Sequence, residues 1–370
     1  MIPRAFARIA NARRHLACLA FAFLAASFAL PAAAYEKPRL IVASDIGNEP
    51  DDSESLVRLL VYSDRVDIRG LIASTSTWQR GAVHPEMMRE RIAAYGKVLA
   101  DLRVHDPAYP DAGYLQSLVK RGSPHYGLSH VGDGCDTEAS AWIVAEADKP
   151  DKRPLWILNW GGSADLAQAL YHVRKTRSPD AVRAFVAKLR VYSISDQDDA
   201  GPWVRQNFPD LFWIASIHAF SQYTGAEWSG ISDDVWSDPH AEHMSGPDTS
   251  LVTNEWLDAH IRKGPLGRLY PNWKYIMEGD SPSFLYLISS GLGDSEHPDW
   301  GSWGGRYGKV APQYGLYSDA VDTAVGVDGK PAKSSKAAVW RWRAAYQNDF
   351  AARIAWSVTP SYRAANHPPV

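Results

Sequence analysis

The sequence predicts an α/β fold, an open and mostly parallel sheet flanked by helices, with its functional site at the carboxyl ends of the strands. Short apolar runs, each long enough for one buried strand, alternate along the chain with longer segments of helical periodicity. Several of these runs end in turns that are rich in Gly, Asn or acidic residues. Because parallel strands end at the same edge of a sheet, these polar turns would gather around one site.

The first predicted strand and helix enclose a concentration of acidic residues. Residues 40–43 predict a buried strand, and the apolar residues within 56–60 predict one side of a helix. Asp45 lies where this strand would end, and Asp51 and Asp52 lie where the helix would begin. Three carboxylates there repel one another unless a cation lies between them, and oxygen ligands suit calcium or magnesium. A helix cap would explain one of these acids but not all three, so we predict a metal-binding or catalytic role.

The first 34 residues have the features of a secretory signal. They combine four arginines, a mostly apolar run over 16–30 and small residues for cleavage at 31–34. We therefore expect cleavage after Ala34, a mature domain over 35–360, a tail or linker over 361–370, and a secreted or periplasmic protein. A retained membrane anchor is the alternative, although the apolar run is short for a spanning helix.

Charge and cysteine content exclude some classes of function. The formal net charge is −3, and the signal contributes only positive charge, so an acidic mature chain argues against nucleic-acid binding. Cys18 would leave with the signal, so Cys135 has no partner for an internal disulfide and is expected to be a buried free thiol. The 15 Trp residues suit either a large core or stacking on sugars and bases.

The remaining elements follow the same alternation. Further strands are predicted over 66–73, 154–158, 190–194 and 212–217, and further helices over 87–102, 137–147, 181–189 and 337–356. The second strand leads into a polar rim segment that ends at Trp78, and Thr137 is placed to cap its helix. Residues 103–137 lack any period, so we expect a loop near the active face. The aromatic residues of the last helix repeat at helical spacing, which favours core packing over ligand binding.

Two later turns also carry candidate binding features. Gly161 and Gly162 follow a predicted strand, where they would allow either close approach of the backbone to a ligand or tight packing alone. The acid-rich loop at 195–202 repeats the pattern of the first turn, so it is a second candidate for ligand binding. The alternative interpretation is that its acids are simply solvated.

The segment from residue 218 to residue 275 has no clean period and is long for a loop. We expect short helices that form a lid or insertion over the pocket. His240, Glu242 and His243 lie within it, but their spacing matches no common zinc motif and favours surface histidines.

The last motifs combine an acid with a cluster of glycine and aromatic residues. Asp280 precedes an apolar helix with Pro282 near its first turn, as a cap would. Residues 300–307 are rich in Gly and Trp, and they suit either a tightly packed turn or a sugar platform with Arg306 as a hydrogen-bond donor.

Together these motifs resemble the nucleoside hydrolase superfamily, and most closely its secreted branch, whose members include chains described as cellulose-binding. The resemblance covers most of residues 38–357 and is strongest in the Asp-rich loop, at 155–170 and at 277–307. It implies a nucleoside-hydrolase-like sheet and a bound Ca²⁺. The implied metal ligands are Asp45, Asp52, Asp280 and the backbone carbonyl of Trp160, and the implied catalytic base is Asp51. The substrate-binding candidates are Asn48, Trp78, Asp199, Asn207, Glu278, Trp303 and Arg306.

The chain departs from the family pattern at three places. Gly279 stands where members usually carry a His thought to assist the leaving base, and Asp199 and Arg205 replace a ribose-binding Asn and a Glu. The Asp-rich loop can be aligned in two ways, with either Asp45 or Gly47 at the ligand position. We favour Asp45, because that alignment keeps a carboxylate on the metal.

Two functions fit these observations. The first is a secreted, calcium-dependent hydrolase of N-glycosidic bonds, acting on a nucleoside or a related ribosyl or glycosyl compound, in which a carboxylate takes a proton from the attacking water. The second is a non-catalytic protein that binds cellulose or another plant polysaccharide on the same fold. A small nucleoside or sugar is the expected partner, and homo-oligomers are common in the superfamily. Asp-nucleophile phosphatases need two acids spaced by one residue, which the Asp45-Ile46-Gly47 turn lacks.

Overall fold

The computed structural model describes residues 36–217, 223–232, 246–291 and 293–367. The chain divides into the units 1–37 and 38–370, and the described helices and strands belong to the second. The predicted secretory signal and the segment that holds His240, Glu242 and His243 lie outside the described residues. In the part of the chain that is described, no helix has the length and apolarity that crossing a membrane requires.

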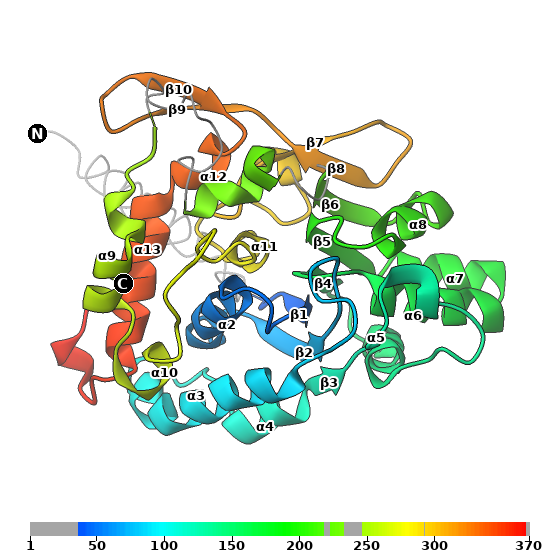
Figure 1. The fold of residues 1–370 in the computed structure, drawn as a ribbon, viewed down its shortest axis with the longest axis horizontal. Coiled ribbons are helices and arrows are strands. Elements are labelled where there is room, and N and C mark those ends of the chain that lie inside the picture. The colour runs from blue at the N-terminus through cyan, green and yellow to red at the C-terminus, as the bar shows by residue number, and fades with distance from the viewer. Residues whose placement is uncertain (1–35, 218–222, 233–245, 292, 368–370) are drawn as a thin grey trace, which may run out of the picture. The chain divides into compact units, whose positions relative to one another are not determined.

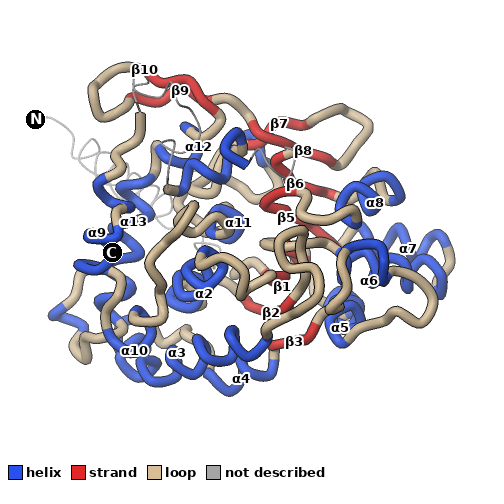
Figure 2. The backbone as a smooth tube through the Cα atoms, viewed as in Figure 1, coloured by secondary structure: helices blue, strands red, loops and turns tan. Residues whose placement is uncertain are grey.

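A single sheet organises the second unit (Figures 1 and 2). Among the described residues it has eight strands in the order β3-β2-β1-β4-β5-β6-β8-β7. Only β7 and β8 pair antiparallel, whereas all the other pairs are parallel, so the prediction of an open, mostly parallel sheet is confirmed. The strands are β1 (Arg39–Ser44), β2 (Asp67–Ala73), β3 (Val119–Arg121), β4 (Leu155–Asn159), β5 (Leu189–Ser195), β6 (Phe212–Ser216), β7 (Tyr307–Lys309) and β8 (Leu316–Asp319). A separate hairpin pairs β9 (Asp322–Val325) with β10 (Pro331–Ser334).

Helices cover both faces of the sheet (Figure 1). One face carries α5 (Glu138–Asp148), α6 (Ala164–Thr176), α7 (Pro179–Val186) and α8 (Ala200–Asn207). The opposite face carries α2 (Asp51–Val61), α3 (Pro85–His105), α11 (Ser281–Leu285), α12 (Ala337–Trp340) and α13 (Arg343–Trp356). The shorter helices are α4 (Ala112–Ser117), α9 (Asn254–His260) and α10 (Gly264–Gly267), with 3-10 turns η1 (Gly127–His130), η2 (Tyr223–Gly225), η3 (Glu227–Ile231), η5 (Ser250–Val252), η6 (Pro298–Trp300) and η7 (Tyr362–Ala364).

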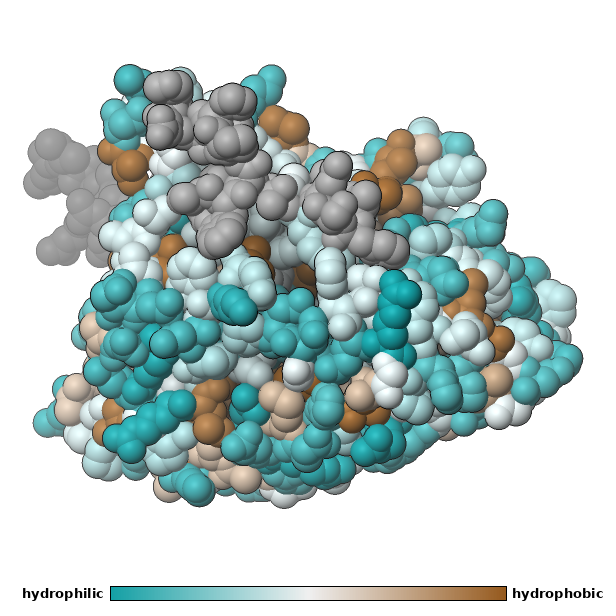
Figure 3. All heavy atoms as spheres, viewed as in Figure 1, coloured by the Kyte–Doolittle hydropathy of each residue, from teal (hydrophilic) through white to brown (hydrophobic). Residues whose placement is uncertain are grey.

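The central strand β1 shows why its sequence is a continuous apolar run. Leu40 and Val42 belong to the hydrophobic core on the α2 side of the sheet, whereas Ile41 and Ala43 belong to the core on the α5–α8 side. Successive side chains of a strand point to opposite faces, so a strand buried on both faces needs apolar residues at every position. The surface drawn in Figure 3, where it is described, is mostly hydrophilic with scattered apolar residues.

Several predicted elements differ in extent from those observed. The segment 103–137, predicted to be a loop, contains α4, β3 and η1, each too short to produce a detectable period. Strands β7 to β10, of three or four residues each, and helix α8 were not predicted. The helix predicted over 337–356 is two helices, α12 and α13, and its aromatic residues Tyr346 and Phe350 are fully buried in the core as expected.

Two smaller predictions have opposite outcomes. Thr137 does cap α5: its hydroxyl accepts a hydrogen bond from the Ser140 amide at 2.9 Å, and the Ser140 hydroxyl accepts one from the Thr137 amide at 2.8 Å. Cys135 is a free thiol, but it is half-buried rather than buried, because it lies in an irregular turn ahead of α5 instead of in the core.

The end of the chain packs against the domain as far as His367. The His367 ring stacks on Tyr362 with the ring centroids 3.7 Å apart, and its Nε2 lies 2.9 Å from Nδ1 of His105, the last residue of α3. The Trp356 indole nitrogen donates to the Asn366 carbonyl at 2.7 Å. Up to this point, the segment predicted as a tail or linker is therefore part of the packed unit.

Candidate active site

A cavity of about 660 Å³ lies beside the carboxyl ends of β1, β4 and β5. Its acidic lining residues are Asp45, Glu49, Asp51, Asp52 and Asp280, and its aromatic ones are Trp78, Trp160, Tyr223, Trp228 and Tyr275. Asn48, Pro50, Ile194, Gln197, Lys274 and Ile276 complete the lining. The cavity therefore combines an excess of negative charge with aromatic surfaces.

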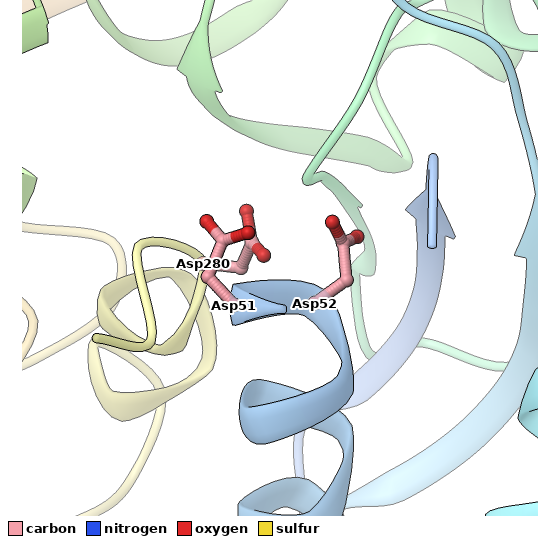
Figure 4. Close-up of side chains that lie close together, drawn as sticks. All are labelled: Asp51, Asp52 and Asp280. Atoms are coloured by element: carbon pink, nitrogen blue, oxygen red, sulfur yellow. The ribbon is translucent and has the colours of Figure 1, made fainter. Parts of the chain in front are cut away.

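Three of these carboxylates form a compact cluster. Asp51 and Asp52 occupy the first turn of α2, and Asp280 immediately precedes α11. One carboxylate oxygen from each lies within 4.8 Å of the other two, and Figure 4 shows all three above the first turn of α2, with Asp51 and Asp280 side by side. The N-cap residue of α2 is Pro50, and Asp280, the N-cap residue of α11, makes no side-chain capping hydrogen bond, so capping does not account for Asp280.

The electrostatics of the cluster are unfavourable in the absence of a cation. Burial and the neighbouring carboxylates raise the pKa of both Asp52 and Asp280 well above the usual range for Asp. The Ser44 hydroxyl donates to Asp52 Oδ1 at 2.5 Å, whereas Asp280 Oδ2 is buried without a hydrogen-bond partner. Among the residues that line the cavity, only Lys274 carries a positive charge.

This donor set fits a hard divalent cation. Carboxylate oxygens that lie a few ångströms apart are the ligands that calcium prefers, and calcium takes six to eight oxygens. The backbone carbonyl of Trp160 is a further oxygen at the cavity, and it already accepts a hydrogen bond from Gln197 Nε2. A carbonyl has two lone pairs, so this hydrogen bond leaves one available to an ion.

Asp45 lines the same cavity but is not a member of the three-carboxylate cluster. It follows β1 directly and is buried, and its Oδ2 has no hydrogen-bond partner. Burial, reinforced by the charge of Glu49, raises the pKa of Asp45 to about 7. The clustered set therefore differs from the predicted ligand set, with Asp51 in the place expected for Asp45.

Two glycines let the carboxylates approach the backbone. A Cβ atom at Gly161 would lie 2.8 Å from Asp45 Oδ1, and one at Gly279 would lie 2.8 Å from Asp51 Oδ2. A side chain at either position would therefore require the facing carboxylate to move.

Comparison with known proteins places the chain in a family. The model of the cellulose-binding Sde182, nucleoside hydrolase-like domain matches residues 39–307. The chain belongs to this family. The solved structure of a nucleoside hydrolase-related hypothetical protein from Saccharophagus degradans, described as associated with carbohydrate metabolism, is 33% identical over 90% of this chain and 74% of that one, with a TM-score of 0.72.

More distant similarity adds little to this assignment. A plant nucleoside hydrolase aligns with 86% of this chain and 99% of its own, but at 12% identity and a TM-score of 0.39, which is too low to support an argument. No curated protein matches the chain significantly.

Two of the predicted substrate-binding residues of this Sde182-like domain lie at the two ends of α8 and do not line the cavity. Asp199 is the residue before α8, and its carboxylate accepts a hydrogen bond from the Leu128 amide at 2.8 Å. Asn207 ends α8, where its side chain bonds to Arg174 and to the Trp203 carbonyl. Helix α8, which was not predicted, follows the acid-rich loop, and Asn207 at its end does not line the cavity.

Three other predicted contacts are part of the scaffold of the Sde182-like domain. Glu278 is completely buried and pairs with Arg58, and Trp303 is partly buried against the main core. Arg306 donates to Asp322 Oδ1 at 2.6 Å. None of them lines the cavity. Within the glycine and aromatic cluster, an isolated bridge pairs Ser302 with Gly305. Asn48 and Trp78, in contrast, do line the cavity.

Sequence reasoning missed several lining residues. Gln197 lies in the acid-rich loop after β5. The sequence drew attention to the acidic residues of this loop and not to the side-chain amide of Gln197. Tyr223, Trp228 and Tyr275 lie in or next to the segment expected to form a lid, and its aromatic content was the available signal.

Proposed function

We propose that this protein is an exported, calcium-dependent hydrolase of N-glycosidic bonds, acting on a nucleoside or a related ribosyl or glycosyl compound. The observation that carries the proposal is the convergence of Asp51, Asp52 and Asp280 within one aromatic-lined cavity. Residues separated by more than 200 positions in the chain meet there, and Lys274 is the only cationic residue that lines the cavity against five acidic ones.

The chain's own residues divide into metal ligands and a base. Asp51, Asp52, Asp280 and the Trp160 carbonyl would hold the cation. A calcium ion bound there would orient a water and the sugar hydroxyls and lower the pKa of that water.

In this arrangement Asp45 takes the role of catalytic base, which the sequence assigned to Asp51, and Asp51 becomes a metal ligand. The unpartnered Oδ2 of Asp45 at the cavity can accept the proton of the attacking water, whose oxygen bonds to the anomeric carbon as the carbon–nitrogen bond breaks. The electron pair of that bond leaves with the nitrogen, which takes up a proton from solvent. Asp51 remains the alternative base. The two assignments can be distinguished by calcium affinity. Substituting Asn for the base should leave the affinity unchanged, whereas substituting Asn for a metal ligand should lower it.

The aromatic residues suit the ring of a substrate. Trp78 and Tyr275 are 46% and 56% exposed although they line the cavity, and Trp78 packs edge-on against Tyr223 with the ring centroids 6.1 Å apart. Rings presented in this way can stack on a base or on the apolar face of a sugar.

A non-catalytic carbohydrate-binding protein is the second candidate. It is favoured by Gly279, which supplies no proton to a leaving base, and by the name of the family, which describes cellulose binding. Under this proposal the same aromatic residues would hold a polysaccharide without turnover.

The test is a hydrolysis assay on the chain from residue 35 onward. Release of reducing sugar from a panel of nucleosides is measured with calcium and with a chelator, for the wild type and for Asp45→Asn and Asp52→Asn. Calcium-dependent release that both substitutions abolish, with calcium affinity lost only in Asp52→Asn, supports the hydrolase and its base. No release, together with retention on cellulose that depends on Trp78, supports the binding protein. Mass analysis of the exported protein tests cleavage after Ala34.

A further inference from the structure

The segment that leads to Asp280 has a strained backbone. Tyr275 and Glu278 have positive φ angles of 71° and 53°, and they are the only described non-glycine residues with this conformation. Side chains with a Cβ atom rarely adopt such angles, which persist only where surrounding contacts impose them, and they cluster at functional sites. Glu278 lies two residues before Asp280, so its conformation directs that carboxylate.

Contacts to α2 impose the conformation of Glu278. Arg58 Nε lies 2.6 Å from Glu278 Oε2, and both side chains are fully buried. The Glu278 amide donates to Glu54 Oε2 at 2.9 Å. Both the side chain and the backbone of Glu278 are thereby attached to the helix that carries Asp51 and Asp52.

Further partners hold the two members of the ion pair. The Tyr270 hydroxyl donates to Glu278 Oε1 at 2.6 Å, and the Ser281 hydroxyl donates to Glu278 Oε2 at 2.7 Å. On the other side, the Arg58 guanidinium lies over the Phe350 ring, 4.2 Å from its centroid, and Nη2 donates to Gln347. The pair is therefore fixed from α13 as well as from the segment before α11.

We propose that the Arg58–Glu278 ion pair is a positioning device for the cation site, an inference that rests on the proposed function. Arg58 lies about two helical turns after Asp51 and Asp52, so one rigid helix presents two ligands and also the anchor of the third. The ion pair holds Glu278 in its strained conformation, and this places the Asp280 carboxylate against the other two. Neither Arg58 nor Glu278 lines the cavity.

The test is calorimetric titration of calcium into the metal-free protein, with Glu278→Gln as the main variant. Outer partners that orient metal ligands typically contribute about 10–100-fold in affinity, and we expect a rise of that size in the calcium Kd. Tyr270→Phe removes one hydrogen bond to Glu278 and leaves the ion pair, so it should fold and show a smaller rise. It keeps the proposal testable if Glu278→Gln does not fold.

A second buried ion pair provides the matched control. Arg353 Nη1 lies 2.6 Å from Asp64 Oδ1, with side-chain exposures of 3% and 0%, and it joins α13 to the other end of α2. Asp64→Asn should lower the thermal midpoint, because Arg353 loses one of its two carboxylate partners and keeps only Asp349, 2.9 Å from its Nε. It should leave the calcium Kd unchanged.

The possible outcomes separate the two proposals. A wild type that binds no calcium overturns the proposed metal site and the positioning device with it. A wild type that binds calcium, with Glu278→Gln and Tyr270→Phe binding equally well, overturns the positioning device alone. Equal loss of affinity in Glu278→Gln and Asp64→Asn also overturns it, because the effect would then follow general stability.

Discussion

Two groups of buried carboxylates in this molecule have opposite relations to their surroundings. Asp165 and Asp198 are buried, but hydrogen-bond donors satisfy them: Asp198 accepts from the amides of Ser163 and Ala200 at 2.8 and 3.0 Å, and Asp165 accepts from the Thr137 hydroxyl at 2.7 Å. The cavity cluster instead leaves Asp280 Oδ2 without a donor and faces other carboxylates. Burial alone therefore does not mark a binding site; the cavity cluster differs from the other buried carboxylates because its members face one another across a cavity and one of their oxygens has no donor.

The largest expected effect concerns the satisfied group. Asp198→Ala would leave the amides of Ser163, Ala200 and Gly201 without their acceptor, at about 1–3 kcal/mol for each buried donor. We expect the free energy of unfolding to fall by about 3 kcal/mol or more, measured by urea denaturation. Calcium should stabilise Asp198→Ala and the wild type by the same amount, so the difference between them should persist at saturating calcium. A difference that disappears when calcium is added would contradict the distinction between the two groups.

The next effect concerns the cluster. Calcium at 100 times its Kd should stabilise the wild type by about 2.7 kcal/mol, because it binds only the folded state. Asp52→Asn should lose this response, and in chelator it should be at least as stable as the wild type, since removing one charge relieves repulsion. Thermal unfolding with and without calcium measures both. A variant that is destabilised in chelator yet still responds to calcium would assign Asp52 to the scaffold.

A smaller effect is expected in the pH dependence of stability, to which the hydrogen-bonded carboxylates Asp165 and Asp198 contribute. Burial raises the pKa of Asp165 to about 6 and that of Asp198 to about 7, from an ordinary value of 3.8. Between about pH 4 and these values the folded state binds more protons than the unfolded state, so these residues reduce stability as the pH rises through that window. Asp165→Asn keeps an oxygen acceptor but cannot titrate. Its thermal midpoint should therefore decline less between pH 4 and pH 7 than that of the wild type.

The smallest effect on stability is expected at Trp78, an exposed aromatic residue that lines the cavity. Trp78 is half-exposed, so Trp78→Ala should change the free energy of unfolding by no more than about 0.5 kcal/mol. Its loss should weaken sugar or nucleoside binding by about 1 kcal/mol if the ring stacks on the ligand. Trp300→Ala is the control, since Trp300 is 59% exposed, stacks on His297 and does not line the cavity. Equal losses of affinity in the two variants would exclude Trp78 as a specific contact.

The sequence allowed the sheet to be predicted because its strands are buried on both faces. Continuous apolar runs such as residues 40–43 and 154–158 identify such strands without any knowledge of their partners. Strand β3 and helix α8 gave no comparable signal, because they are short and partly exposed.

The site was predictable only in part, for a different physical reason. The acids at 51 and 52 were recognisable from their position before a helix, but their meeting with Asp280 depends on contacts across more than 200 residues. The Arg58–Glu278 ion pair spans the same separation, so Glu278 looked like a substrate contact and Arg58 like an ordinary helix residue. The close approach of Asp45 to Gly161 joins two turns more than 100 residues apart, so the periodicity of the sequence could not predict it.

The most direct test of the cation site is a crystal structure of the protein grown with calcium. The expected result is one anomalous peak at about 2.3–2.6 Å from carboxylate oxygens of Asp51, Asp52 and Asp280, with Asp45 outside this distance. A peak coordinated by Asp45 in place of Asp51 would restore the ligand set that the sequence suggested. A cavity with no peak at millimolar calcium would contradict the cation site, and with it the proposed hydrolase.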